Sequence, residues 1–272
     1  MGADRATSRG GSRIPILMYH SVDTSGSVVS TPPSAFAAQM RFLHESGVQT
    51  LSLSAAVEAL RRGPVPARAA VITFDDGFES VYKDAFPVLV KYGISATVFL
   101  VTGYCGRDNS WPSQPRHITR RPLLTWGQVT EMHHAGLSFG AHTHTHPHLT
   151  SLSRCGAEDE ILTSKQTIED HLQQPVQAFA YPYGAYDEEI KRVAAAHFAV
   201  ACSTRLAFAR PGSDMLALER LDVHYLRRPL TFRRLFSAEM RVYLGLRRAA
   251  RELRTWDLLK AGRPGPVRRE GY

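Results

Sequence analysis

Short apolar runs alternate with amphipathic segments along most of the chain. The runs are rich in Val, Ile, Leu, Phe and Ala, and the segments between them repeat apolar residues at helical spacing. The predicted strands are 14–20, 50–53, 70–76, 96–101, 137–142, 178–183, 198–203 and 216–223. The predicted helices are 34–46, 54–62, 81–92, 126–135, 155–173 and 188–197. This alternation implies right-handed crossovers and a parallel sheet, and seven or eight such units favour a barrel.

The chain is long enough for such a barrel to form a single domain. It has 272 residues, 43% of them hydrophobic, which suffices for one large core. The predicted fold class is therefore α/β. Each polar motif described below follows an apolar run, at the end of the strand where barrel enzymes place their sites.

Two adjacent carboxylates, Asp75 and Asp76, end the third predicted strand in the sequence Val-Ile-Thr-Phe-Asp-Asp-Gly. Neighbouring like charges repel, and burying either one unpaired costs several kcal/mol, so a cation is the natural partner. The alternative is a simple turn, because Asp bonds its own backbone and Gly tolerates positive φ.

Four histidines, at positions 142, 144, 146 and 148, follow the fifth predicted strand. Two neutral imidazoles and one carboxylate form a common ligand set for first-row metals and leave positions for water and substrate. A solvated loop is the alternative for the histidines alone. Together with the aspartates, the cluster favours a metal site.

Three motifs, taken in order, resemble those of the polysaccharide deacetylase family, the NodB-homology or carbohydrate esterase family 4 enzymes. They are Thr-Phe-Asp-Asp-Gly at 73–77, His-Thr-x-Thr-His-Pro at 142–147 and Phe-Ala-Tyr-Pro-Tyr-Gly at 179–184. Residues 15–22 also resemble the opening strand of one branch of the family. The resemblance covers about residues 14–224 and implies a distorted (β/α) barrel of about seven strands, with one divalent metal, that removes N-acetyl groups from amino sugars.

The resemblance also implies roles for individual residues. Asp76, His142 and His146 are the expected metal ligands, with zinc as the first choice and cobalt, nickel, iron or manganese as alternatives. Asp75 is the expected general base, which takes a proton from a water activated by the metal. The backbone N–H of Tyr183 is expected to stabilise the oxyanion.

The match to the family weakens for the proton donor and for one arginine. His224, in a late segment after the last predicted strand, is the candidate donor, and strand alternation places Arg220 and Asp222 on its face. Ala180 stands where relatives carry an arginine in the third motif. Arg220 is the candidate to orient Asp75 in place of that arginine.

Three further residues are candidates for contact with the substrate. His20 ends the first predicted strand and is expected at the same rim, in contact with substrate or with the ligands, or as a strand cap. Tyr181 and Tyr183 are expected either to stack on a sugar ring or to pack in the core and rim. His144 and His148 are left outside the ligand set. The long polar connection 103–122, with Trp111, is interpreted as a loop beside the substrate groove.

The formal net charge of +8 is concentrated near the C-terminus. Residues 205–272 carry sixteen Lys and Arg against seven Asp and Glu, or +9, which leaves −1 for the rest. An apolar helix stripe at Phe236, Met240, Tyr243 and Leu244 opposes arginines 233, 234, 241 and 248. Such a helix either packs on the barrel or docks to an anionic membrane surface or a phosphate-bearing lipid-linked sugar. No recognised motif for binding nucleic acid accompanies the charge.

The expected organisation is a flexible N-terminus (1–13), a NodB-like barrel (14–230), basic amphipathic C-terminal helices (231–261) and a disordered tail (262–272). Cys105, Cys155 and Cys202 are odd in number and widely spaced, which favours reduced thiols buried as small hydrophobes. No apolar leader or membrane-length apolar run is visible. We therefore expect a cytoplasmic location, with peripheral membrane attachment as an alternative.

The function predicted from the sequence is metal-dependent removal of N-acetyl groups from an N-acetylglucosamine-type oligosaccharide, polysaccharide or glycoconjugate. A related amidohydrolase acting on a formamide, a cyclic imide or another non-sugar amide is the alternative enzyme, because metal and base fix only the type of bond. A barrel that binds carbohydrate with impaired catalysis is the non-enzymatic alternative.

Overall fold

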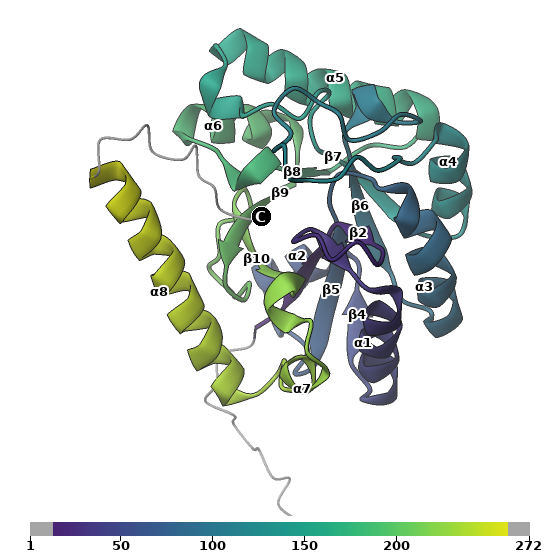
Figure 1. Cartoon of the computed structure of the whole chain (residues 1–272), viewed down its shortest axis with the longest axis vertical. Helices are drawn as coiled ribbons and strands as arrows, with labels where there is room; N and C mark the ends of the chain where they lie inside the picture. The colour runs from purple at the N-terminus through teal and green to yellow at the C-terminus, as the bar shows by residue number, and fades with distance from the viewer. Residues whose placement is uncertain (1–12, 261–272) are drawn as a thin grey trace, which may run out of the picture.

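The computed structural model describes residues 13–260 (Figure 1). Its centre is a ring of parallel strands that closes on itself, with helices around the outside. Around the ring, the strands are β1 (Ile16–Tyr19), β10 (Leu218–Asp222), β9 (Val200–Leu206), β8 (Ala178–Ala180), β7 (Ser138–Ala141), β6 (Ala96–Leu100) and β5 (Ala69–Phe74). β1 pairs with β5 and completes the ring, so the prediction of a distorted barrel of about seven strands is confirmed.

An eighth strand, β4 (Gln49–Leu51), lies outside the ring. It pairs with β5 from Ala69 to Val71, whereas β1 pairs with β5 from Val71 to Phe74. One edge of β5 is thus shared by two strands in succession. A pair of short strands, β2 (Ser21–Val22) and β3 (Ser30–Thr31), forms a separate small sheet after β1.

All six predicted helices are present, within a few residues of the expected bounds. They are α1 (Pro33–Glu45), α2 (Leu53–Arg62), α3 (Phe86–Tyr92), α4 (Trp126–His134), α5 (Arg154–Leu172) and α6 (Glu188–His197). The expected helix 81–92 starts with a π-helical turn, η1 (Val81–Ala85). Short 3₁₀ turns follow several strands: η2 (Thr102–Tyr104), η3 (Leu149–Ser151), η4 (Pro182–Gly184) and η5 (Val223–Leu226).

Polar side chains fix where several of the outer helices begin. Thr125 and Gln128 form a reciprocal capping box at α4. Asp187 accepts hydrogen bonds from two backbone N–H groups at the start of α6.

Two more helices follow the barrel, α7 (Pro229–Arg233) and α8 (Ala238–Lys260). α8 stands along one side of the barrel (Figure 1), with Met240 and Leu244 of the predicted apolar stripe buried against the core. None of the described helices combines the length and the apolar character needed to cross a bilayer. The expected disordered tail and nearly all of the expected flexible N-terminus lie outside the described residues.

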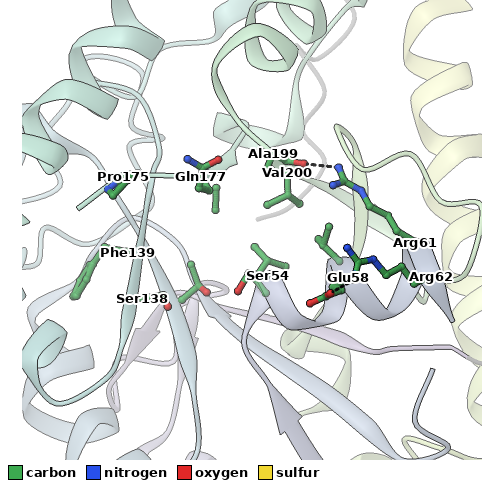
Figure 2. Close-up of a pocket in the computed structure, with 14 residues that line it drawn as sticks. Ser54, Glu58, Arg61, Arg62, Ser138, Phe139, Pro175, Gln177, Ala199 and Val200 are labelled. Carbon is green, nitrogen blue, oxygen red and sulfur yellow. Dashed lines mark hydrogen bonds and ion pairs between the residues drawn. The ribbon is translucent and has the colours of Figure 1, made fainter. Parts of the chain in front are cut away.

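α2 closes the barrel at the amino-terminal ends of the strands. Its Leu53 and Val57 belong to a core cluster that also contains residues inside the ring. A cavity of about 460 Å³ lies between α2 and the starts of β7, β8 and β9 (Figure 2). Arg61 donates a hydrogen bond to the carbonyl of Ala199 and ties α2 to this end (3.1 Å). Because this cavity is at the amino-terminal ends of the strands, it is opposite the polar motifs, and we interpret it as structural.

A phenylalanine fills the middle of the barrel. A Cβ added to Gly140 on β7 would lie 2.6 Å from the Phe99 ring and 2.9 Å from the Ala178 carbonyl. Gly140 therefore makes room for Phe99. Above it, the guanidinium of Arg220 lies 5.6 Å from the centre of the Phe99 ring.

No disulfide links the cysteines of the described chain. Cys202 is buried inside the barrel and Cys105 is half-buried, but Cys155 is exposed near the start of α5. The expectation of a buried small hydrophobe is therefore wrong for Cys155. Its position on the outer face of a surface helix explains the difference.

We predict that Gly140→Ala destabilises the barrel by about 1–3 kcal/mol, because the new methyl group overlaps the Phe99 ring and a backbone carbonyl. Urea unfolding measures this change. Gly245→Ala in α8 is the matched control, since nothing lies within 4 Å of its added Cβ, and it should be neutral or slightly stabilising. Equal losses for both variants would contradict the role of Gly140.

Candidate active site

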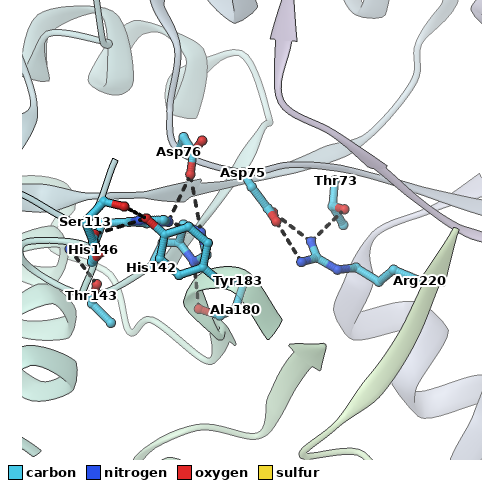
Figure 3. Close-up of polar contacts among 10 residues, drawn as sticks. All are labelled: Thr73, Asp75, Asp76, Ser113, His142, Thr143, His146, Ala180, Tyr183 and Arg220. Atoms are coloured by element: carbon cyan, nitrogen blue, oxygen red, sulfur yellow. Dashed lines mark hydrogen bonds and ion pairs between the residues drawn. The ribbon is translucent and has the colours of Figure 1, made fainter. Parts of the chain in front are cut away.

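The polar motifs meet at one rim of the barrel, where the parallel strands end (Figure 3). β5 is followed by the two aspartates, β7 by the histidine loop, and β8 by Tyr183 in η4. Arg220 reaches the same place from inside β10. The structure thus brings together Asp75, Asp76, His142, His146, Tyr183 and Arg220.

Asp76, His142 and His146 form a compact, buried triangle of donor atoms. Nε2 of each histidine lies 3.4 Å from Oδ1 of Asp76, and the two Nε2 atoms lie 3.3 Å apart. Asp76 Oδ1 accepts no well-formed hydrogen bond from the described residues. A polar atom buried in this way calls for a partner.

The hydrogen-bond network assigns the protons of both imidazoles. His142 donates from Nδ1 to the Ala180 carbonyl (2.7 Å). His146 donates from Nδ1 to the hydroxyl of Tyr183 (3.1 Å), which in turn donates to Ser113 (3.0 Å). In the neutral form of each imidazole, Nε2 therefore carries the lone pair, and both Nε2 atoms lie beside Asp76 Oδ1.

This triangle fits a divalent metal. Metal–nitrogen distances of about 2.0–2.1 Å and tetrahedral angles place neighbouring donors about 3.3–3.4 Å apart. The observed sides of 3.3, 3.4 and 3.4 Å match that spacing. A shared proton would satisfy one side of the triangle, whereas a cation satisfies all three donors.

Burial and charge set the protonation states of the ligands. Burial lowers the pKa of His146 to about 4, so this imidazole is neutral at pH 7. Burial alone would raise the pKa of Asp76, but His142 and His146 outweigh it and hold that pKa well below its usual range. Burial alone would lower the pKa of His142, but Asp76 and then Asp75 raise it, so a metal competes with a proton for its Nε2. A neutral imidazole and a carboxylate are the forms that bind metal.

Four residues around the site have left-handed backbone conformations that are unusual for residues other than glycine. The φ angles are 70° at Asp76, 68° at Thr143, 57° at His146 and 58° at Tyr183. Each such residue costs about 1–3 kcal/mol, which surrounding contacts must offset. At Asp76 the conformation turns the side chain away from Asp75, so the two neighbouring carboxylates reach different partners (Figure 3).

Glu160 on α5 holds the histidine loop in this conformation. Its Oε2 accepts hydrogen bonds from the backbone N–H groups of His144 (2.9 Å) and Thr145 (2.8 Å), and its Oε1 accepts one from the Thr145 hydroxyl (2.6 Å). The Thr143 hydroxyl accepts a hydrogen bond from the His146 N–H (3.0 Å). Glu160 thus holds the loop from α5, and Thr143 holds it by a hydrogen bond within the loop.

Asp75 forms a buried, two-point ion pair with Arg220. Both distances between guanidinium nitrogens and carboxylate oxygens are 2.7 Å. Arg220 also donates to the Ser203 carbonyl (3.0 Å) and to the Thr73 hydroxyl (3.3 Å). Burial alone would raise the pKa of Asp75, but Arg220 and then His142 lower it, so Asp75 is ionised at pH 7.

The other predicted site residues take different positions. His20 is buried and directly follows β1, whose last residue Tyr19 pairs with Phe74 just before the two aspartates. Tyr181 is fully buried, stacks on Tyr186 and donates to the Leu216 carbonyl (2.8 Å). Its ring therefore has no free face for a sugar.

Two histidines of the motif lie next to the triangle. His144 Nδ1 is 3.0 Å from the Thr102 hydroxyl, so its ring is engaged outside the donor set. His148 stacks on the Tyr183 ring, with 4.1 Å between ring centres. The same ring also meets His146 in a T-shaped contact and is nearly buried, which leaves little surface for a sugar.

His224 does not share a strand face with Arg220. β10 ends at Asp222, and His224 lies in the following 3₁₀ turn, η5, where Asp222 accepts a hydrogen bond from its N–H (2.9 Å). Its ring lines a groove together with Tyr225 and Tyr243. The assignment of His224 as proton donor stays a prediction.

Sequence reasoning missed two residues that support the ligands, Ser113 and Glu160, and it placed Trp111 beside the substrate groove without a contact to a ligand. The Trp111 ring is buried 4.5 Å from the His146 ring, and the Ser113 hydroxyl donates to the His146 carbonyl. The 103–122 connection therefore forms a packed wall of the site. The Trp-Pro pair was visible in the sequence, but its contact with the histidine loop was not.

Comparison with known proteins agrees with this geometry. The family profile described as polysaccharide deacetylase matches residues 62–200, about half of the chain. YxkH of Bacillus subtilis, whose name describes it as a polysaccharide deacetylase, is 34% identical to this chain over 213 residues. The match covers 78% of this chain and 71% of that protein. The chain belongs to the polysaccharide deacetylase family. It is accordingly a hydrolase of carbon–nitrogen bonds with a site for a divalent metal.

Two further relatives of this deacetylase illustrate the similarity. The poly-β-1,6-N-acetyl-D-glucosamine N-deacetylase of Staphylococcus epidermidis is 31% identical over 172 residues, covering 60% of this chain and 57% of that protein. The deacetylase PplD of Streptococcus pyogenes, solved with acetate, has a TM-score of 0.68 and 30% identity, covering 78% of this chain and 92% of that one. The chain therefore spans little more than half of the staphylococcal enzyme and most of PplD.

We predict that Tyr183→Phe weakens metal affinity about 10- to 100-fold, because it removes the acceptor that fixes the His146 ring. A competitive chelator titration measures the affinity. Tyr181→Phe is the matched control, since it also removes a buried hydrogen bond but touches no ligand. Its metal affinity should be unchanged. Equal affinity in the two variants would contradict the role of Tyr183.

Proposed function

We propose that this deacetylase removes N-acetyl groups from an N-acetylglucosamine-type oligosaccharide, polysaccharide or glycoconjugate. The observation that carries the proposal is the division of the two adjacent aspartates. Asp76 belongs to the donor triangle, whereas Asp75 lies beside it as an ionised carboxylate held by Arg220. The staphylococcal relative's name supports an amino-sugar substrate.

The metal is proposed to be zinc, because two imidazoles and one carboxylate at tetrahedral spacing form its usual catalytic ligand set. Cobalt, nickel, iron and manganese accept similar donors. When bound, the metal supplies Lewis-acid chemistry, which polarises an amide carbonyl and makes water more acidic.

Asp75 is proposed to take the proton of the attacking water. Both of its oxygens bind Arg220, but each keeps a lone pair for a second hydrogen bond. The bidentate grip fixes the direction of the carboxylate and keeps it ionised at neutral pH. These are the requirements for a base placed by geometry before the substrate arrives.

The remaining steps need a donor to the oxyanion and a proton for the leaving amine. The backbone N–H of Tyr183 is proposed as the oxyanion donor, in a segment whose shape is fixed by Gly184. A Cβ at Gly184 would lie 2.0 Å from the Thr204 hydroxyl. His224 is the proton donor proposed from the sequence, and His20 is a second candidate because it follows β1 where β1 ends next to the end of β5.

Two other functions predict different products. Hydrolysis of a formamide releases formate, hydrolysis of a cyclic imide opens its ring, and a carbohydrate-binding barrel does neither. Parallel incubations of the metal-loaded protein with N-acetylglucosamine oligomers, a formamide and a cyclic imide, followed by assays of acetate, formate and ring opening, separate the three. Absence of acetate from every sugar tested would contradict the proposed function.

The finer assignments of place and partner stay predictions. They are a cytoplasmic location, attachment to an anionic membrane surface or to a lipid-linked sugar, and the division into a barrel (14–230) and C-terminal helices (231–261). The expectation of no nucleic-acid partner also stays a prediction.

We predict that the two aspartates fail in different ways. Asp76→Ala should lose the metal, as should His142→Ala and His146→Ala, because each removes one of three protein ligands. Asp75→Asn should keep about one equivalent of metal yet lose about 10²- to 10⁴-fold in rate, because an amide cannot accept the proton. Elemental analysis and acetate release on the same preparations test this. A metal-free Asp75→Asn or a metal-loaded Asp76→Ala would overturn the division.

We predict that Arg220→Met moves the acidic limb of the pH–rate profile to higher pH. Arg220 now lowers the pKa of Asp75, and without it burial dominates and raises that pKa. The loss of rate should therefore be greatest at low pH and smallest at high pH, with metal content unchanged. Arg220→Lys, which keeps one charge, should show a smaller shift and less loss of stability. A uniform loss at all pH values would argue against this role.

A further inference from the structure

The outer face of α8 carries a row of exposed apolar side chains: Val242, Leu246 and Leu253 (the α8 row). They are 64%, 68% and 66% exposed, and their spacing of four and seven residues places them on one helix face. The small residues Gly245 and Ala249 lie exposed between them. The buried face of the same helix is already occupied, because Met240 and Leu244 pack against the barrel.

This concentration of exposed apolar surface is local. The described residues include six exposed large apolar side chains, and four of them belong to α7 and α8. The fourth is Leu230, 75% exposed at the edge of a groove between α7, η5 and α8. The other two, Val90 and Leu152, lie on separate elements. Scattered single residues need no partner, but a row on one helix does.

Positive charge surrounds this surface. Residues 229–260 contain eight Lys and Arg and three Asp and Glu, or +5, whereas the chain before residue 205 carries −1. The groove of about 990 Å³ beside Leu230 is lined by one acid, Glu239, and by arginines 227, 228, 234 and 247. Exposed leucines among arginines match a surface with an apolar interior and anionic headgroups.

We propose that α7 and α8 dock the protein onto a membrane rich in anionic phospholipid. α8 lies in the plane of the interface, with the α8 row in the acyl boundary and the surrounding arginines on headgroup phosphates. A second copy of the chain fits less well, because the same positive charges would face each other across the contact. The inference concerns attachment only and stands independently of the proposed chemistry.

The test uses the full chain and vesicles of phosphatidylcholine, alone or with phosphatidylglycerol. We expect co-sedimentation with the anionic vesicles, which weakens as salt is raised. The triple variant Val242→Gln, Leu246→Gln, Leu253→Gln keeps the charge and should bind at least about tenfold more weakly. Val90→Gln is the matched control, since it removes an exposed apolar side chain on α3 and should bind like the parent.

A second variant, Arg228→Gln with Arg234→Gln, tests the charge separately and should reduce binding to the anionic vesicles while sparing the α8 row. Unchanged melting temperatures establish that the variants fold. The proposal is overturned if the parent ignores both vesicles, or if the triple variant binds like the parent. It is also overturned if sedimentation without lipid shows a dimer that the triple variant converts to monomer.

Discussion

The buried ion pair between Asp75 and Arg220 makes the rest of this site possible. Two adjacent aspartates at the end of one strand cannot both be buried as anions without separate cations. Arg220 reaches through the barrel interior and forms an ion pair with Asp75. Asp76 instead lies with His142 and His146 in the donor triangle, where it is placed to bind a metal. Without that division the two carboxylates would share one cation and perform one role.

The position of the pair depends on what lies beneath it. Arg220 rests over Phe99, and Phe99 fits because Gly140 has no side chain. The interior thus changes from apolar at the α2 end to polar at the rim within a few layers of side chains. Asp76, His146 and Tyr183 have strained backbone conformations. Hydrogen bonds to Glu160 and packing of Trp111 on His146 offset the free-energy cost of this strain.

The sequence predicted the parts of this arrangement that depend on local pattern. Strand ends, helix starts, and the gathering of Asp75, Asp76, His142 and His146 at one rim all follow from periodicity and from the rule that parallel strands end together. Arg220 was expected beside Asp75 only as a replacement for the arginine that relatives carry in the third motif, and the structure shows the two paired. The distance between them depends on how β10 and β5 each pair with β1, which no local pattern records.

Errors arose where an element ended earlier than its pattern suggested. Strand alternation predicted that His224 shares a face with Arg220, but β10 ends at Asp222 and a 3₁₀ turn redirects the chain.

Other differences arise from tertiary contacts. Tyr181 and Tyr183 look equivalent in the sequence, yet the Tyr181 ring is stacked in the core and the Tyr183 hydroxyl holds the His146 ring. Glu160 is one of several acids on α5, and only the fold shows that it faces the histidine loop.

The ring of seven strands gives a physical reason for the position of the site. Eight strands enclose an interior just wide enough for side chains to fill, and a smaller ring is narrower. Because β4 lies outside the ring and β1 closes onto β5, packed side chains fill the interior, with Phe99 beneath Arg220 and Cys202 buried in the same cluster as Phe99. A narrow interior leaves no room for a metal at depth. The ligands must therefore come from residues just beyond the strand ends, and there the backbone has to turn sharply enough to point them at one another.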